Sequence, residues 1–199
     1  AGNALTVDDA VTVGSSGTLE VAGQVDADTV DVGGTLMGSG TVAGPVTIES
    51  GGTLAPGNSA GTLTLEDGVT FESGSTFAVE IDGLTLAGTD YDLLVLSGGN
   101  AVLDGLLDLT FAPGVSGTFG DIIYILDNQL GTTSGTFQYA DNDVVGTFNG
   151  TPWAITYNAT TGSGLDGGSS IALFAIPEPS TLLLAAAASV LLCRRRRRW

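Results

Sequence analysis

The amino-acid sequence predicts an all-β protein, a right-handed parallel β-helix (β-solenoid) followed by a short transmembrane helix at the C-terminus. Three observations lead to this prediction. A short motif of two strands joined by a small-residue turn recurs in the first 80 residues. Glycine (31 of 199 residues), Thr, Val and Leu are abundant, and these residues favour turns and strands over helices. The chain's basic side chains form one block, directly after an apolar segment near the C-terminus.

The first region, residues 1–80, is predicted to consist of stacked repeats. In each copy Val, Ile or Leu alternates with Thr, Asp or Glu, so one face of each strand is apolar. Counted from the last apolar residue of each copy, the steps are 17, 18 and 23 residues. A unit this short cannot bury its own apolar face, whereas stacked copies bury one another's. The four copies are residues 11–19, 30–36, 46–54 and 69–77.

The same alternation predicts which side chains form the core and how the copies pair. Leu36 and Leu54 are expected to point inward on neighbouring strands of one ladder. The alternative fold is a β-sandwich, in which residues 65–69 would turn a hairpin. The side chains predicted to point inward are Val13, Leu19, Val32, Leu36, Ile48, Leu54, Phe71 and Phe77.

The second region, residues 81–176, is predicted to continue the solenoid with a bulkier core and capping strands. No aromatic residue precedes Phe71, and every Phe, Tyr and Trp lies from there onward. Residues 121–126 are mostly apolar, as in a strand buried on both faces. Residues 153–157 alternate cleanly and can pair with residues 170–176 across a polar loop. An antiparallel hairpin here would cap the open end of the stack.

The third region, residues 177–199, has the features of a membrane address. Pro177, Glu178 and Pro179 interrupt regular structure, and residues 181–193 carry no charge. A helix of these 13 residues would be roughly 20 Å long, against a hydrocarbon core of about 30 Å, so it would make a short span. Basic residues beside a span stay cytoplasmic, which places the rest of the chain on the far side. The basic block is Arg194, Arg195, Arg196, Arg197 and Arg198.

This tail resembles the PEP-CTERM sorting signal of exported bacterial proteins. The resemblance rests on Pro177-Glu178-Pro179, the apolar segment and the arginine block, in that order. It implies recognition by an exosortase, a membrane-embedded cysteine transpeptidase, and removal of the tail. It also implies export, membrane anchoring before processing, and association with the cell surface or exopolysaccharide. Because the chain opens with Ala1-Gly2-Asn3, we expect a signal peptide to have preceded this start.

A second resemblance lies in the first region. Residues 52–63 read Gly-Thr-Leu-Ala-Pro-Gly-Asn-Ser-Ala-Gly-Thr-Leu, which is similar to the GxLxPGxSxGxL signature of autotransporter-associated β-repeat proteins. This resemblance implies a parallel β-helix in an exported surface protein. From the residues alone, Pro56-Gly57 predicts a turn at this point of the chain.

Charge and composition argue against several classes of function. Residues 1–176 contain 21 acidic groups and no Lys, Arg or His, which argues against nucleic-acid binding because phosphate contacts need cations. Without histidine, and with Cys193 as its single cysteine, the chain lacks the nucleophile pairs and zinc sites that use them. We therefore expect no enzyme, no catalytic residue and no cofactor.

Calcium is the one ligand that the carboxylates suggest, because oxygen-rich sites suit it. The clusters are Asp26, Asp28 and Asp31; Asp90 and Asp92; and Asp141 and Asp143. A solvated acidic face explains them more simply, and no metal-binding residue is predicted. The sequence thus indicates an exported, non-enzymatic surface or extracellular-matrix protein. The alternative is a glycan-binding or glycan-active β-helix protein, which would need exposed aromatic residues aligned along a groove.

Overall fold

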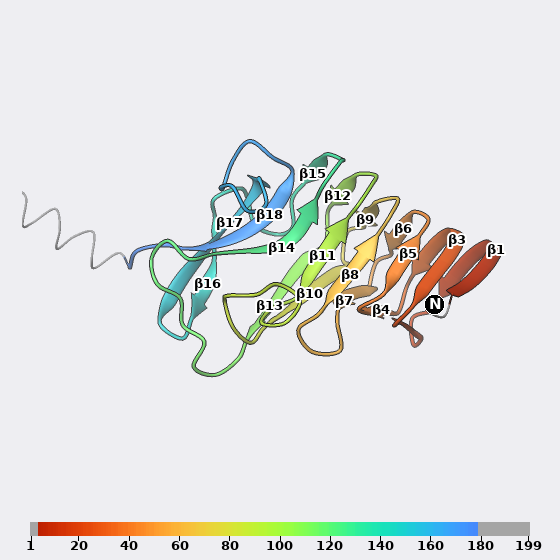
Figure 1. The fold of residues 1–199 in the computed structure, drawn as a ribbon, viewed down its shortest axis with the longest axis horizontal. Coiled ribbons are helices and arrows are strands. Elements are labelled where there is room, and N and C mark those ends of the chain that lie inside the picture. Colours follow the sequence, from red (N-terminus) through yellow and green to blue (C-terminus); the bar gives the residue numbers. More distant parts are fainter. Residues whose placement is uncertain (1–3, 179–199) are drawn as a thin grey trace, which may run out of the picture.

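The computed structural model describes residues 4–178 and is all-β, with 18 strands and no helix in that range. Figure 1 shows an elongated body in which the strands stack side by side along the long axis. The stack begins with β1 (Ala4–Val13) and ends with β16 (Val144–Phe148), β17 (Thr151–Ala159) and β18 (Ser170–Ala175). The two ends of the described chain therefore lie at opposite ends of the body.

The larger sheet has 13 strands and is curled and open. It bends at β3 (Gln24–Val32). The first residues of β3 pair with β5 (Thr41–Ala43), and its last residues pair with β6 (Val46–Ile48). β1 lies parallel to β3 on the outer side. One row continues through β5 (Thr41–Ala43), β8 (Thr62–Leu65), β11 (Leu93–Leu96) and β14 (Ile122–Asn128), and the other through β6 (Val46–Ile48), β9 (Val69–Phe71), β12 (Ala101–Leu103) and β15 (Thr133–Gly135).

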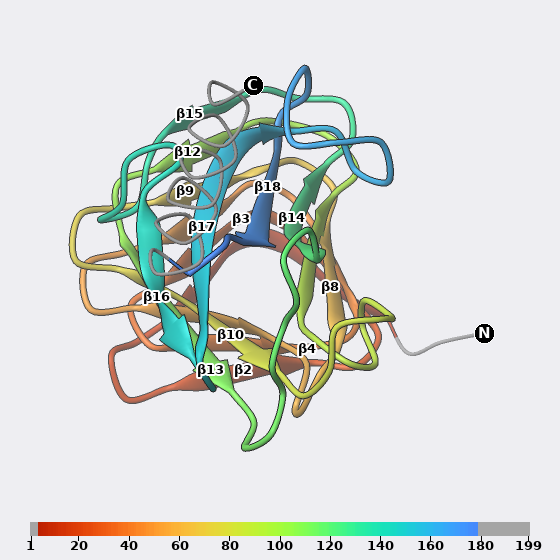
Figure 2. The same cartoon turned by 90° about the vertical axis from the view of Figure 1, so that its left-hand side faces the viewer.

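The smaller sheet supplies a third row of parallel strands. From β5 to β15 the chain visits the three rows in a fixed order, so each strand from β5 to β12 pairs with the strand three places later. Figure 2, which looks along the body, shows the rows arranged around the core. The third row is β2 (Thr18–Val21), β4 (Thr35–Gly38), β7 (Thr53–Pro56), β10 (Thr76–Ile81) and β13 (Leu106–Phe111).

The pairing predicted between repeats is confirmed. Leu36 pairs with Leu54, and Leu54 pairs with Phe77, in parallel ladders. All three side chains are fully buried. Of the eight side chains predicted to point inward, seven are buried, and Leu19 is partly exposed. Leu19 lies on β2, which has a partner strand on one side only, so no further turn of the stack (rung) covers it.

The hairpin required by the alternative β-sandwich is absent. Leu65 ends β8 and Val69 begins β9, but these two strands do not pair with each other. β8 instead pairs with β5 and β11, and β9 pairs with β6 and β12. Residues 66–68 therefore form a corner between two rows, not the turn of a hairpin.

The bulkier core predicted for the part of the chain that contains the aromatic residues, from Phe71 onward, is present. The rings of Phe71 and Phe77 lie 5.5 Å apart, and Phe137 lies within 5.9 Å of both. Aromatic pairs at such separations stabilise a core beyond the area that they bury. Tyr157 adds its hydroxyl, which donates to the Tyr139 carbonyl oxygen and accepts from the Phe137 amide.

The predicted antiparallel hairpin is also confirmed. β17 pairs antiparallel with β18, with Ile155 opposite Leu173. β18 lies antiparallel to β14, and β16 lies antiparallel to the outer side of β17. The parallel stack therefore ends in three antiparallel strands, at the end of the body where residue 178 lies (Figure 1).

Candidate functional site

The point where the chain leaves the folded body is the first candidate site. Ala175 donates its amide to the Asp121 carbonyl oxygen at 2.9 Å, and its own carbonyl accepts from the Gly120 amide at 3.2 Å. The Ile176 amide donates to the Pro152 carbonyl oxygen at 3.0 Å. The next residue is Pro177, which has no amide hydrogen and cannot extend this pairing. The predicted sorting sequence, which begins at Pro177, thus starts directly after a residue that is hydrogen-bonded to the body.

The predicted sorting residues fall on both sides of the boundary of the described chain. Pro177 is partly buried and Glu178 is exposed. Pro179, the apolar segment with its predicted transmembrane helix, and Arg194 to Arg198 lie outside the described residues. Within residues 4–178, no helix is long and apolar enough to cross a membrane.

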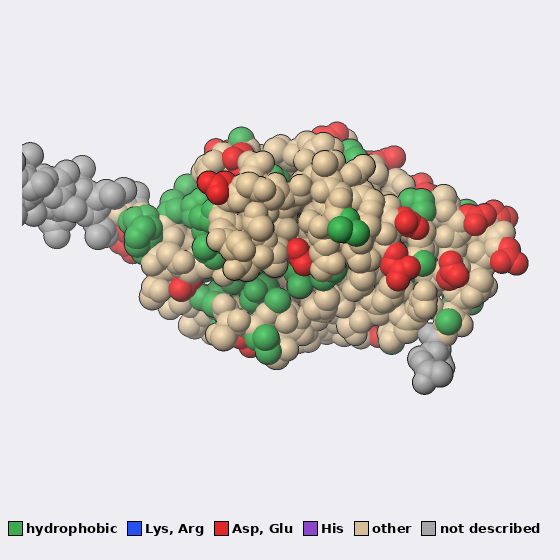
Figure 3. All heavy atoms as spheres, turned by 45° about the horizontal axis from the view of Figure 1, so that its top comes forward, with side chains coloured by type: hydrophobic (Ala, Val, Ile, Leu, Met, Phe, Trp, Pro, Cys, Tyr) green, Lys and Arg blue, Asp and Glu red, His purple; other side chains and the backbone are tan. Residues whose placement is uncertain are grey.

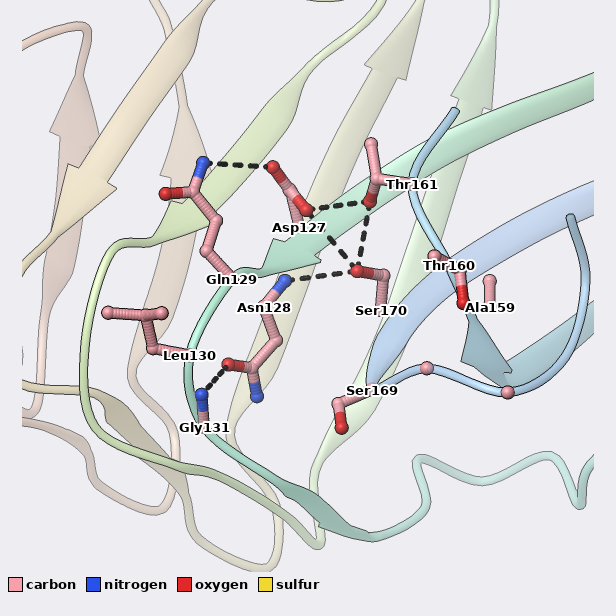
Figure 4. Close-up of a pocket in the computed structure, with 12 residues that line it drawn as sticks. Asp127, Asn128, Gln129, Leu130, Gly131, Ala159, Thr160, Thr161, Ser169 and Ser170 are labelled. Carbon is pink, nitrogen blue, oxygen red and sulfur yellow. Dashed lines mark hydrogen bonds between the residues drawn. The ribbon is translucent and has the colours of Figure 1, made fainter. Parts of the chain in front are cut away.

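A polar hollow of about 500 Å³ lies between the end of β14 and the loop joining β17 to β18. Asp127 is its organising residue, and Figure 4 shows its carboxylate accepting hydrogen bonds from Thr161 and Ser170. Gln129 donates to the other carboxylate oxygen at 3.1 Å. Leu130 stands at the rim with 82% of its surface exposed. The sequence carries no local signal for this hollow, because its walls, residues 127–131 and 159–170, are far apart in the chain.

Asp92 is a buried carboxylate beside a second, smaller hollow of about 170 Å³. Its oxygens accept from the Gly61 amide at 2.9 Å and the Glu80 amide at 2.8 Å. Burial raises the pKa of Asp92 to about 7, although the two amide hydrogen bonds oppose the shift; the charges of Glu80 and Asp82 add to it. The sequence contained a signal, because Asp92 directly precedes β11 (Leu93–Leu96) and continues the alternation that places Leu94 and Leu96 inside.

The structure does not bring the predicted acidic clusters together as a metal site. Among residues 4–178, no group of three or more acidic, His or Cys side chains is placed to hold a metal ion. Asp90 accepts from the Thr85 and Leu86 amides, whereas Asp92 faces Gly61 and Glu80. Asp141 accepts from the Tyr157 amide, and Asp143 from the Ala140 amide. Backbone amides therefore donate to each of these four carboxylates.

The aromatic side chains do not form the exposed row that a glycan groove would need. Phe71, Phe77, Phe137 and Trp153 are buried in the core. Among the large apolar side chains of the described residues, Phe119 is the exposed aromatic one, with 74% of its surface accessible. The hollow of Figure 4 is lined by polar and aliphatic residues only.

Comparison with known proteins identifies one feature of the chain. Residues 175–198 match the PEP-CTERM protein-sorting motif. The match starts at Ala175, the last residue of β18, and includes all the sorting residues predicted from the sequence. The motif supports an exported protein that is membrane-associated and is targeted by an exosortase-type membrane enzyme. No curated protein matches the chain.

Proposed function

We propose that this protein is an exported, non-enzymatic component of the cell surface or extracellular matrix, delivered there through its C-terminal tail. The observation that carries the proposal is the sorting motif at residues 175–198. The exosortase-type enzyme recognises Pro177, Glu178 and Pro179 while the apolar segment holds the tail in the membrane. Arg194 to Arg198 keep the far end in the cytoplasm, since each charge is costly at the bilayer centre. Removal of the tail then releases the body to the surface or to exopolysaccharide.

The body in this proposal is a right-handed parallel β-helix of the kind found in autotransporter-associated repeat proteins. Its support is the parallel pairing of each strand from β4 to β12 with the strand three places later. The glycines of residues 52–63 add to this support, because a side chain on Gly61 would come within 2.6 Å of the Gly57 Cα. Such a stack has the shape of a rigid spacer, which suits a surface protein without catalytic groups.

A glycan-binding role is the second candidate, and the hollow of Figure 4 favours it. Asp127, Gln129 and Thr161 present oxygen and amide groups at an open concavity, and sugar hydroxyls bind to such groups. Glycan-array binding by the full chain and by Asp127→Ala tests this role. Loss of array signals in the variant would support it, and identical patterns would reject it. Release of reducing ends from extracellular polysaccharide would argue for a glycan-active enzyme.

The sorting proposal is tested in cells of a host that carries the sorting enzyme. Glu178→Ala should leave the protein inserted but uncleaved, because it removes the acidic side chain between the two prolines. Glu72→Ala is the matched control, since Glu72 is another exposed glutamate far from the tail. Replacing all five arginines with Ser should weaken retention and orientation. The measurement is the mass and location of the mature protein in each variant.

Normal tail loss in Glu178→Ala would reject the role assigned to this residue, and the tail would then act only as an anchor. Retention of the full mass in a strain without the enzyme, with cleavage restored by its return, would support the proposal. The near-ultraviolet circular dichroism spectrum should be unchanged in Glu178→Ala and in the variant without the five arginines. This checks that the fold of the body does not depend on the tail.

A further inference from the structure

An apolar row crosses the antiparallel end of the larger sheet on its outer face. Val144 of β16 pairs with Ala154 of β17, which pairs with Phe174 of β18, which pairs with Ile122 of β14. Paired residues on neighbouring strands lie on the same face of a sheet. Trp153, Ile155 and Leu173 occupy the opposite, inner face and are fully buried. The row thus lies on the outer face of the sheet. Ala154 is buried there, Phe174 and Ile122 are partly exposed, and Val144 keeps 52% of its surface exposed.

This row contrasts with the outer face of the repeats. At the equivalent outward positions of β3, β6 and β9, the paired residues are Asp31, Thr47 and Thr70. Figure 3 shows the same contrast on one face of the molecule: apolar side chains gather at the end where the chain leaves the body, and carboxylates gather toward the opposite end. The outer face is thus polar at these positions of β3, β6 and β9 and apolar across the final strands.

Phe119 extends this apolar surface to the exit of the chain. Its loop is bonded to β18 through the Gly120 amide, which donates to the Ala175 carbonyl oxygen. Phe119 itself has 74% of its surface exposed and lies outside any strand. We call Val144, Phe174, Ile122, Ile176 and Phe119 the exit patch.

The length of the connecting chain limits how far this patch can lie from a membrane. The Ile176 amide bonds to the body at the Pro152 carbonyl oxygen, and the uncharged segment begins five residues later at Thr181. Five residues span at most roughly 17 Å when fully extended. The headgroup layer on each side of a bilayer is several ångströms thick. With the tail inserted, the end of the body must therefore lie close to the lipid surface.

We infer that the exit patch rests on the lipid surface before the tail is removed, with Phe119 inserted among the headgroups. This inference rests on the membrane stage of the proposed function. A large exposed aromatic ring at the membrane-facing end is the type of residue that enters this interface. The contact orients the body and holds residues 177–179 at a fixed height above the bilayer, beside the membrane-embedded enzyme.

The charges around the patch define which lipids it accepts. Asp121 accepts from Thr118 in the same loop as Phe119, and Asp143 directly precedes Val144. Residues 1–176 contain no cationic side chain that could offset these carboxylates. Anionic headgroups would repel them. The fitting surface is therefore zwitterionic, such as phosphatidylcholine or phosphatidylethanolamine.

The test uses the full chain reconstituted into phosphatidylcholine vesicles whose acyl chains carry bromine, which quenches tryptophan emission at short range. Phe119→Trp places a reporter in the exit patch. Leu130→Trp is the matched control, because Leu130 is also highly exposed but follows the opposite end of β14. The signal of the unsubstituted chain, which has Trp153 and Trp199, is subtracted from both.

The expected result is that the added emission at position 119 is strongly quenched and that at position 130 is not. Replacing half of the lipid with phosphatidylglycerol should reduce the quenching at position 119 while the chain stays in the vesicle pellet. Equal quenching at the two positions in pelleted protein would overturn the inference and leave the membrane anchor intact. Protein that stays in the supernatant would instead overturn the membrane stage itself.

A partner protein is the competing occupant, and a second measurement separates it from lipid. Phe119→Ser combined with Val144→Ser should abolish contact with lipid in the same vesicles, reported by Thr118→Trp beside the patch. Two results together would show that the lipid inference is wrong. In vesicles, the emission of Thr118→Trp would be unquenched even when Phe119 and Val144 are present. In cells, the double variant would slow tail removal, which would mean that the patch binds the sorting enzyme.

Discussion

At the scale of single residues, the glycine positions show how closely the backbones of neighbouring rungs approach each other. Gly34 precedes Thr35 at the start of β4, and a Cβ there would lie 2.2 Å from the Gly17 carbonyl oxygen. Gly52 holds the same position before β7, where a Cβ would lie 2.1 Å from the Val32 carbonyl oxygen. The recurring Gly-Thr-Leu sequence therefore has a steric reason, because backbone of the preceding rung fills the space of a side chain.

Gly34→Ala is expected to destabilise the body by about 1–3 kcal/mol, the usual cost of forcing extra atoms into a packed site. Gly14→Ala is the matched control, since a Cβ at Gly14 would meet nothing within 4 Å. The control should be neutral or slightly stabilising. Chemical denaturation of both variants measures the difference. Equal losses would show that the rungs do not stack this closely in solution.

Asp92 makes the stability depend on pH. Burial raises its pKa in the folded state from 3.8 to about 7, so the folded protein binds this proton more tightly than the unfolded chain. Its stabilising contribution is complete below about pH 4 and is lost as the pH rises to about 7. The unfolding temperature should therefore fall between these values. Asp92→Asn, which cannot ionise, should show a smaller fall than the unsubstituted protein, and identical slopes would contradict this assignment.

At the scale of the strand, burial of the ladder of apolar side chains stabilises each rung. Leu54 lies on β7 between Leu36 and Phe77, its partners on β4 and β10, and all three are fully buried. Thr53 lies on the outer face of the same strand and pairs with Thr35 and Thr76. One strand therefore offers a buried and a solvent-facing position in equivalent backbone settings.

Leu54→Ala should cost about 2–5 kcal/mol, because it removes buried methyl groups and leaves a cavity between rungs. Thr53→Ala on the same strand should cost less than about 1 kcal/mol, since it changes only strand preference at the surface. Urea unfolding followed by circular dichroism gives both values. Comparable losses would mean that the inner and outer faces are assigned wrongly.

The exposed edge strand at the start of the stack, β1, carries charged side chains that hinder pairing with other chains. β1 pairs with β3 on one side, and its register shifts between Val7 and Ala10, where the chain contains Asp8 and Asp9. Irregular pairing and carboxylates on an edge strand hinder pairing with other chains. Asp8→Val with Asp9→Val should promote self-association, measured by sedimentation velocity. Asp26→Val is the control, because Asp26 is also exposed but lies on β3 between two paired strands, opposite Thr6 and Ala43. Equal association in both variants would reject the protective role of Asp8 and Asp9.

At the scale of the whole molecule, the dominant feature is a negative charge without internal compensation. Residues 1–176 contain 21 carboxylic acids and no basic side chain. No ion pair between side chains can form within this segment, so the carboxylates accept from amides and hydroxyls or face solvent. Mutual repulsion favours the expanded chain, and salt or bound cations weaken that repulsion.

The unfolding temperature should therefore rise with ionic strength, and more in calcium than in sodium salts at equal ionic strength. Thermal unfolding in matched NaCl and CaCl₂ solutions measures both effects. A midpoint that is constant across salt would show that the carboxylates are too far apart to matter. Equal midpoints in the two salts would show that calcium acts only by screening.

The sequence by itself determined the strand-rich composition, the inward side chains of the repeats, the final hairpin and the sorting motif. These features are local: period-two alternation decides which face of a strand is apolar, and the tail is a linear signal. Tertiary structure alone decided that residues 66–68 turn a corner between rows, that Asp127 and Thr161 meet at one hollow and that an apolar row crosses the final strands. Each depends on register between segments distant in the chain, which is set when all rungs pack together.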